Sequence, residues 1–249
     1  MAASFTSHSV MAVIPVYREL GKIGRVISKF TDDFADEVCV VVDCPTEAIL
    51  GEIQESSKEI SVPVHVIENG TRNGIGYAIR EGIDYALEKK FDIVVVLAGN
   101  NKDDPGEIPR FLKAIVVNGF DYVQGSRFLP GGKREKTPIF RFLFIRLYPF
   151  FWTLLTGVRC TDVTNGFRAY KTGIFRDERI NVWQGWLDGY ALEYYLHFKV
   201  LKLGYRTKEV PVSKIYPYMH RGGYSKISPF RDFWSIVAPF VYLVLGVKK

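Results

Sequence analysis

The stretch Val10–Val16 reads VMAVIPV and decides the class of fold. It is apolar at every position, so both of its faces must be buried, as in a strand inside a parallel sheet. Four similar runs follow, at Val38–Asp43, Val62–Ile67, Asp92–Leu97 and Asp121–Gln124. Helical patterns lie between the runs, near residues 20–31, 46–58, 73–89 and 105–117. These five β-α units predict an α/β fold with helices flanking a mostly parallel sheet.

The composition bounds the class of protein. The 249 residues include 33 Lys+Arg and 27 Asp+Glu, a net charge of +6, and 47% are hydrophobic, which suits one full-sized folded domain. Cys39, Cys44 and Cys160 form no CxxC pair, so we expect neither a disulfide scaffold nor a zinc ribbon. The basic residues are dispersed rather than interleaved with aromatic ones, so nucleic acid is not an expected partner. We also expect no secretory signal.

The residues that follow the apolar runs are the first place to look for a ligand, because open parallel sheets bind ligands at the carboxyl ends of their strands. They are Pro15–Glu19, Asp43–Pro45, Arg72–Gly76, Ala98–Asn100 and Gly125–Arg127. Glycines let the backbone approach a ligand, and a helix N-terminus favours an anion. The set therefore suits a nucleoside diphosphate, although Asn73 and its glycines could equally form an ordinary cap and turn.

The chain resembles the family-2 glycosyltransferases of GT-A fold, most closely the dolichol-phosphate mannose synthase-like, polyprenyl-phosphate branch. The matching segments run in order along the chain: IPVYRE (14–19), VVVDCPTE (40–47), RNGIGYAIREGI (72–83), LAGNNKDDPGEIP (97–109), GSRF with LPGG (125–132), TDVTNGFRAY (161–170), GYALE with YRTKEVPV (189–193 and 205–212) and GGYSKIS (222–228). Each segment alone is a weak signal, and their shared order is the specific one. The resemblance implies a GT-A, Rossmann-like fold.

The resemblance also implies roles in binding a nucleotide-sugar donor, with UDP or GDP as the nucleotide. Pro15, Tyr17 and Glu19 would line the base pocket, and Asp43 would hold the base or ribose. The remaining donor-binding candidates are Arg72, Gly74, Gly76, Ala98, Gly99 and Asn100.

The metal motif is where the sequence departs from its family. The resemblance places an Asp-x-Asp that carries Mg²⁺ or Mn²⁺ at Ala98-Gly99-Asn100, where both carboxylates are missing. Asn100 keeps one oxygen ligand without its charge. Asp103 and Asp104 could supply replacement carboxylates, or they could cap the helix that begins near Pro105. The sequence leaves both interpretations open.

Cations and carboxylates in the matched motifs are the catalytic candidates. Arg127, Arg168 and Lys226 could hold phosphate groups. Asp188 and Glu193 are the candidate general bases, which a hydroxyl acceptor needs and a phosphate acceptor does not. Asp162 could lie at the acceptor site, or it could pair with Arg168 in a purely structural role.

Two apolar segments raise the question of a membrane. Residues 139–156 (IFRFLFIRLYPFFWTLLT) contain two arginines and a proline, so lying in the membrane interface is favoured over spanning. An oligomer contact would bury the same face. Residues 233–247 are shorter than a span and could form an interfacial anchor or an oligomer helix.

The sequence therefore predicts a GT-A domain over residues 1–228. Residues 1–125 would form its donor half, residues 126–228 its acceptor half, and residues 229–249 an apolar C-terminal segment. The predicted reaction is inverting transfer of a hexose from a nucleoside diphosphate sugar to polyprenyl phosphate, at the cytoplasmic face of a membrane. The alternatives are transfer to a sugar or lipid hydroxyl, and a nucleotide-sugar-binding protein without catalysis.

Overall fold

A seven-stranded sheet forms the centre of the computed structural model, which describes residues 8–134, 139–215 and 233–248. The strand order is β3-β2-β1-β4-β7-β5-β8, and only β7 runs antiparallel to its neighbours. The strands are β1 (Val10–Val16), β2 (Glu37–Asp43), β3 (Val64–Asn69), β4 (Ile93–Val96), β5 (Tyr122–Ser126), β7 (Arg168–Lys171) and β8 (Thr207–Pro211). A separate short ladder pairs β6 (Lys133–Arg134) with β9 (Ser213–Lys214).

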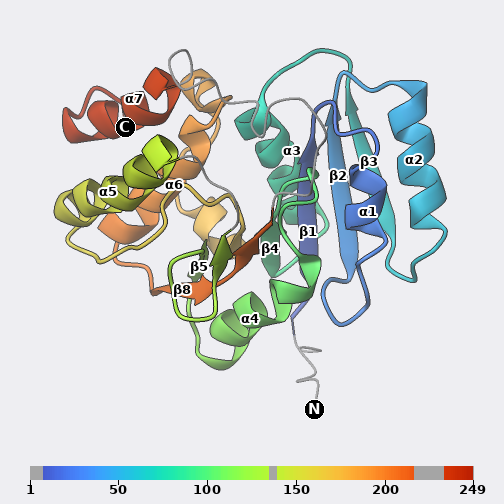
Figure 1. Ribbon diagram of the computed structural model, residues 1–249, viewed down its shortest axis with the longest axis horizontal. Coiled ribbons are helices and arrows are strands. Elements are labelled where there is room, and N and C mark those ends of the chain that lie inside the picture. Colours follow the sequence, from blue (N-terminus) through green and yellow to red (C-terminus); the bar gives the residue numbers. More distant parts are fainter. Residues whose placement is uncertain (1–7, 135–138, 216–232, 249) are drawn as a thin grey trace.

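Helices cover both faces of this sheet, as the alternation of runs predicted. They are α1 (Ile23–Ile27), α2 (Glu47–Ser57), α3 (Ile75–Glu88), α4 (Ile108–Leu112), α5 (Ile139–Thr156), α6 (Ala191–Lys202) and α7 (Phe233–Val244). In Figure 1, α5, α6 and α7 gather at one end of the molecule and α2 lies at the other. The α/β fold with a mostly parallel sheet is confirmed.

The alternation of side chains along β1 explains why its run is continuously apolar. Val10, Ala12, Ile14 and Val16 face a core that includes residues of α1, α2 and α4. Met11 and Val13 face a second core that includes residues of α3, α5 and α6. Each face is buried against helices, so a polar residue on either face would be left without water or a partner.

The strands β7 and β8 lie outside the five predicted runs. Their sequences, RAYK and TKEVP, are short and half polar, so they carry no strand signal of their own. These segments become strands because they pair with neighbouring strands. β7 lies between β4 and β5, and β8 pairs with the other side of β5. This insertion brings the segment that precedes Arg168 to the same sheet edge as the loops after β4 and β5.

One side of α5 is buried and another presents apolar side chains to solvent. Tyr148 and Trp152 pack into the second core, where the Trp152 ring lies 5.5 Å from that of Phe240 in α7. Exposed apolar side chains recur at a spacing of three and four residues, which makes a stripe along the helix. They are Leu147, Phe150, Phe151 and Leu154, between 49% and 76% exposed. Within the described ranges, no helix has both the length and the hydropathy needed to cross a bilayer.

Candidate active site

Three residues beyond the carboxyl ends of central strands have left-handed backbones. They are Arg18 after β1, Cys44 after β2 and Asn101 in the loop after β4, with φ of 54°, 52° and 56°. Such a conformation costs a non-glycine residue about 1–3 kcal/mol and tends to occur at functional sites. Nothing in the sequence predicted this strain. Three of the four non-glycine residues with such backbones in the described ranges thus lie at the sheet edge where ligands were expected, and the fourth, Lys90, follows α3.

Tyr17 joins two of the candidate donor-binding segments. The guanidinium of Arg72, from the loop after β3, lies 4.8 Å from the centre of the Tyr17 ring, and that of Arg18 lies 5.1 Å from it. Cations over an aromatic face are attracted by its quadrupole. The two loops therefore meet around one ring and place positive charge at the sheet edge. Nearby, Glu19 is 7% exposed and accepts a hydrogen bond from Lys22 Nζ at 2.7 Å.

Asp43, at the end of β2, organises the loop that leads into α3. Its carboxylate accepts hydrogen bonds from the backbone amides of Asn73 (3.0 Å) and Gly74 (2.9 Å) and from Asn69 Nδ2 (3.1 Å). The side chain is nearly fully buried. These hydrogen bonds give Asp43 a structural role, which is to hold the loop. The resemblance implied a different role, contact with the base or ribose of the donor.

The N-terminus of α3 is satisfied by the protein itself. The amides of Gly76 and Tyr77 donate to the carbonyl of Asp188, at 2.7 and 3.1 Å. The glycines permit this contact, because a Cβ on Gly76 would lie 1.9 Å from the Leu187 oxygen. On Gly74 it would lie 2.5 Å from the Asp188 oxygen. The expectation that this terminus would bind an anion is therefore corrected: a carbonyl already occupies these amides.

Asp188 is held in place by Arg80, which was not among the predicted site residues. The Arg80 side chain is 2% exposed and donates to the carbonyls of Val182 (2.9 Å) and Gln184 (3.0 Å) and to the Asp188 carboxylate. Its guanidinium also lies 4.7 Å from the centre of the Trp183 ring. The Asp188 side chain is 43% exposed, so it lies at the surface beside α3 as part of an ion pair.

The loop after β4 contains Ala98-Gly99-Asn100, the position at which the resemblance placed the metal motif. Asn100 accepts a hydrogen bond from the amide of Lys102 at 3.2 Å, so its side-chain oxygen already has a donor. Asp103 is buried and forms an ion pair with Lys214 at 2.8 Å. Asp104 caps the helical turn Pro105–Glu107 by accepting from the Gly106 amide at 3.2 Å. The capping interpretation of Asp104 thus agrees with the geometry.

Arg127 and Asp162 form a buried, two-pronged ion pair. Arg127 Nε and Nη2 each lie 2.6 Å from one of the two Asp162 carboxylate oxygens. Arg127 is 7% exposed and Asp162 is fully buried. The pair fastens the segment that precedes β7 to the end of β5. Asp162 is therefore the partner of Arg127. The sequence had left open a place at the acceptor site or a pair with Arg168.

Arg168 lies beneath the site rather than in it. Its side chain is 1% exposed and donates to the carbonyls of Asn165 (2.9 Å), Val163 (2.8 Å) and Glu193. The Glu193 carboxylate lies 3.8 Å from Arg168 Nε. This geometry gives the guanidinium a structural task and does not support its predicted direct contact with phosphate. Lys226, the remaining predicted cation, lies outside the described residues.

The sheet edge therefore brings most of the predicted residues together. The loops after β1 and β3 meet at Tyr17, the loop after β2 joins α3 through Asp43, and the loop after β4 meets β9 through Asp103. Ala98 and Gly99 lie in that last loop, and a Cβ on Gly99 would lie 2.8 Å from Val16 Cγ2. Pro15 lies within β1, paired with Val41 of β2.

Comparison with known proteins points to one family. The model of glycosyl transferase family 2 matches residues 11–178. The chain belongs to this family. The sequence of this glycosyltransferase is 29% identical over 207 residues to an undecaprenyl-phosphate mannosyltransferase of Micrococcus luteus, covering 82% of each chain. It is 26% identical over 207 residues to the polyprenol monophosphomannose synthase of Mycolicibacterium smegmatis, covering 82% of this chain and 76% of the relative.

Solved structures confirm that the glycosyltransferase has a GT-A fold. The glucosyl-3-phosphoglycerate synthase of Mycobacterium tuberculosis superposes with a TM-score of 0.66 at 16% identity, covering all of this chain and 85% of that one. A complex of the same synthase with Mn²⁺, UDP and phosphoglyceric acid gives a TM-score of 0.65, with 98% and 81% covered. That complex of the synthase contains a divalent cation together with the nucleotide.

The donor atoms of this glycosyltransferase do not fit such a cation. Ala98 and Gly99 offer no side-chain ligand, and the Asn100 oxygen already accepts a backbone hydrogen bond. The Asp103 carboxylate is neutralised by Lys214, and Asp104 caps a helix. Across the described ranges, no three His, Cys, Asp or Glu side chains come together as metal ligands would. We derive no catalytic step through a metal.

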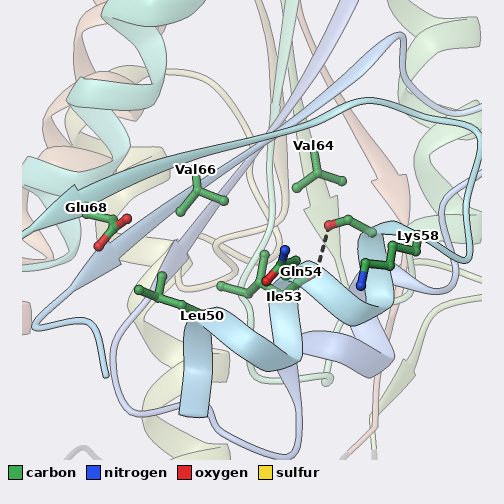
Figure 2. A pocket seen from close by; sticks show the side chains of 8 residues that line it. Leu50, Ile53, Gln54, Lys58, Val64, Val66 and Glu68 are labelled. Carbon is green, nitrogen blue, oxygen red and sulfur yellow. Dashed lines mark hydrogen bonds between the residues drawn. The ribbon is translucent and has the colours of Figure 1, made fainter. Parts of the chain in front are cut away.

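Two hollows lie away from the strand-end residues. One, of about 440 Å³, lies between α2 and the edge strand β3. In Figure 2, Leu50 and Lys58 lie on the helix side of this hollow, and Val64, Val66 and Glu68 lie on the strand side. The other, of about 470 Å³, lies at β5 and β8 and includes Tyr122, Thr161 and His197 in its lining. The lining of neither hollow includes Tyr17, Asp43 or the loop Ala98–Asn100.

His197 in α6 gives the glycosyltransferase a predicted pH dependence of stability. Burial, together with the charge of Arg168, lowers its pKa from 6.5 to about 3. The unfolded chain therefore binds this proton near pH 6.5 and the folded chain only near pH 3. We expect the free energy of unfolding to fall by up to about 1.4 kcal/mol per pH unit as the pH drops through this window.

Urea unfolding of the wild type and of His197→Phe between pH 7 and pH 4 measures this effect. The Tyr122 hydroxyl, 3.1 Å from His197 Nδ1, keeps Gln124 as a partner in the variant. We expect a shallower loss of stability in acid for His197→Phe. Identical pH dependences would show that His197 does not titrate as its burial requires.

Proposed function

We propose that this glycosyltransferase transfers a hexose from a nucleoside diphosphate sugar to a polyprenyl phosphate, with inversion, at the cytoplasmic face of a membrane. The names of the two relatives support this acceptor, and they make a mannosyl donor the first to test. The UDP complexes of the solved synthase make a UDP-sugar the second.

The observation that carries the proposal is that the two candidate bases, Asp188 and Glu193, and the third candidate carboxylate, Asp162, all lie against arginines. Asp188 pairs with Arg80, Glu193 lies beside Arg168, and Asp162 pairs with Arg127. A hydroxyl acceptor needs a base to remove its proton during attack. A phosphate acceptor is already an anion and needs none. Carboxylates occupied by arginines therefore favour phosphate.

The same observation favours a single displacement. Each of these three carboxylates lies against an arginine, so none of them is placed to act as a nucleophile and form a covalent glycosyl intermediate. A phosphate oxygen of the acceptor forms the new bond to the anomeric carbon. The bond from that carbon to the diphosphate breaks, and its electron pair leaves with the diphosphate. One displacement at one carbon inverts its configuration.

The exposed stripe on α5 favours a lipid acceptor at a membrane. Leu147, Phe150, Phe151 and Leu154 form an apolar surface on the helix, and single-face helices of this kind lie in the headgroup region. The stripe would bring the protein to the layer in which a polyprenyl phosphate presents its head. A contact between two copies of the chain would cover the same surface and is the competing explanation.

A transfer assay with matched acceptors tests the proposal. The full chain is incubated with labelled GDP-mannose or UDP-glucose and vesicles that contain either undecaprenyl phosphate or the corresponding undecaprenol. We expect label in the organic extract only with the phosphate. Transfer to the free alcohol instead would overturn the phosphate acceptor. Product without any need for vesicles, with a water-soluble acceptor, would overturn the membrane proposal.

Asp188→Asn and Glu193→Gln test the absence of a general base. Both variants keep oxygen acceptors for Arg80 and Arg168 but lose basicity. We expect transfer within about threefold of wild type, whereas loss of a general base typically costs about 10²–10⁴-fold. A hundredfold fall in kcat with an unchanged circular dichroism spectrum would assign that carboxylate as a base and favour a hydroxyl acceptor.

A further inference from the structure

The ion pair between Asp103 and Lys214 lies in the loop where the family pattern places its metal. Lys214 Nζ lies 2.8 Å from one Asp103 carboxylate oxygen and 3.0 Å from the other. The Asp103 side chain is fully buried, and that of Lys214 is 13% exposed. The ammonium thus spans both oxygens of the carboxylate, and the lysine side chain keeps a small exposed area.

The backbone fixes this lysine beside the loop. The amide of Ile215 donates to the carbonyl of Lys102 at 3.0 Å, which ties the end of β9 to the residue before Asp103. A lysine in such a setting has little rotational freedom left to lose when it binds an anion. Its charge is pre-positioned, as a bound metal would be.

The hydrogen-bonding capacity of this corner suits an anion rather than a cation. An ammonium has three donors. Two are used by Asp103, and the third makes only a 3.5 Å contact with Asn165 Oδ1. Asn165 Nδ2 is itself buried without a partner among the described residues. Lys214 Nζ and Asn165 Nδ2 are therefore neighbouring donors that lack a good acceptor. A diphosphate oxygen would accept hydrogen bonds from them, whereas Mg²⁺ or Mn²⁺ accepts none.

Local charge leads to the same conclusion. In the family pattern, two carboxylates balance one divalent cation. Here Ala98 and Asn100 are neutral, and the single Asp103 carboxylate is balanced by the single Lys214 ammonium. Before a nucleotide binds, a divalent cation would place two further positive charges near that ammonium, with only the exposed Asp104 carboxylate close by in sequence to offset them.

We propose that Lys214, positioned by Asp103, takes the place of the divalent cation, and that the nucleoside diphosphate binds without Mg²⁺ or Mn²⁺. This inference rests on the proposed nucleotide-sugar donor. When the anomeric bond breaks, the electron pair stays on the leaving diphosphate oxygen. The Lys214 ammonium offsets that charge and keeps its proton.

Calorimetric titration of UDP and GDP into the full chain tests this inference without any transfer. We expect at least one nucleotide to bind with the same Kd, within about twofold, in EDTA and in Mn²⁺. Lys214→Met should weaken that binding in EDTA by about tenfold or more, the loss expected for a charge-assisted contact. Lys214→Arg should retain most of it, and Lys58→Met, at an exposed site on α2, should match the wild type.

A double variant that removes both charges of the pair controls for misfolding. Lys214→Met alone leaves a buried carboxylate unpaired, so Lys214→Met with Asp103→Asn is measured beside it. We expect the double variant to fold and to bind weakly with or without Mn²⁺. The single variant, with Asp103 uncovered, should regain binding when Mn²⁺ is added.

The outcomes separate this inference from the proposed reaction. Wild-type nucleotide binding that disappears in EDTA would overturn the lysine's role, as would unchanged binding in the double variant. No binding of either nucleotide under any condition would overturn the inference together with the donor class. Metal-independent binding without transfer to polyprenyl phosphate would overturn only the acceptor.

Discussion

Replacing Arg168 by alanine is expected to lower the free energy of unfolding by about 3–5 kcal/mol, the cost of breaking a buried charged network. The side chain is 1% exposed and donates to three backbone carbonyls, those of Val163, Asn165 and Glu193. Alanine would leave these acceptors buried without donors and the Glu193 carboxylate without its arginine. Urea unfolding followed by circular dichroism measures the change.

Two further variants give this result its meaning. Arg25→Ala, at an exposed position of α1, should change stability by less than about 0.5 kcal/mol. Arg168→Lys should recover part of the loss, because lysine keeps the charge but has fewer donors. Wild-type stability in Arg168→Ala, combined with lost transfer, would instead return Arg168 to the direct phosphate contact that the sequence predicted.

The positions of the first five strands could be predicted because buried parallel strands carry their own signal. The strands β1, β2 and β4 are short runs that are apolar on both faces, as Val10–Val16 shows. The edge strand β3 is only half-buried and includes His65 and Glu68. The strands β7 and β8 could not be predicted in this way, since they exist through pairing with β4 and β5. The register in which distant segments meet is a property of the whole fold.

The chemistry of the site was less predictable than its location. Sequence placed polar and basic residues at the strand ends, and the structure brings most of them to one edge. It could not say which arginines face the ligand, because burial depends on distant partners such as Asp162 for Arg127. It also could not foresee Lys214, which reaches Asp103 from 111 residues away.

The exposed apolar stripe on α5 shows a third case. Periodicity within one helix is local information, so the apolar surface of α5 could be expected from the sequence. What covers that surface is not encoded in the helix. Membrane contact therefore stays a prediction of the proposed function, tested by the dependence of transfer on vesicles.

Gly76→Ala is the substitution for which we expect the largest effect on transfer. Its Cβ would lie 1.9 Å from the carbonyl oxygen of Leu187 and 2.5 Å from that of Gly189. Both are backbone atoms, so the segment that carries Asp188 must move by an ångström or more. The hydrogen bonds from the amides of Gly76 and Tyr77 to the Asp188 carbonyl, at 2.7 and 3.1 Å, would then be lost.

The expected consequences are a loss of about 1–3 kcal/mol in the free energy of unfolding, typical of overpacking, and a fall in kcat/KM of about a hundredfold. The fall is expected because a displacement at Gly76 also shifts the preceding loop Arg72–Gly74, which Asp43 holds through the amides of Asn73 and Gly74. Gly189→Ala is the matched control, because no atom lies within 4 Å of its added Cβ although it belongs to the same segment. Equal transfer by both variants would show that the close approach of this segment to α3 does not shape the site. A fall only in Gly76→Ala would show that a contact between backbones, across more than 100 residues of chain, positions the catalytic edge of the sheet.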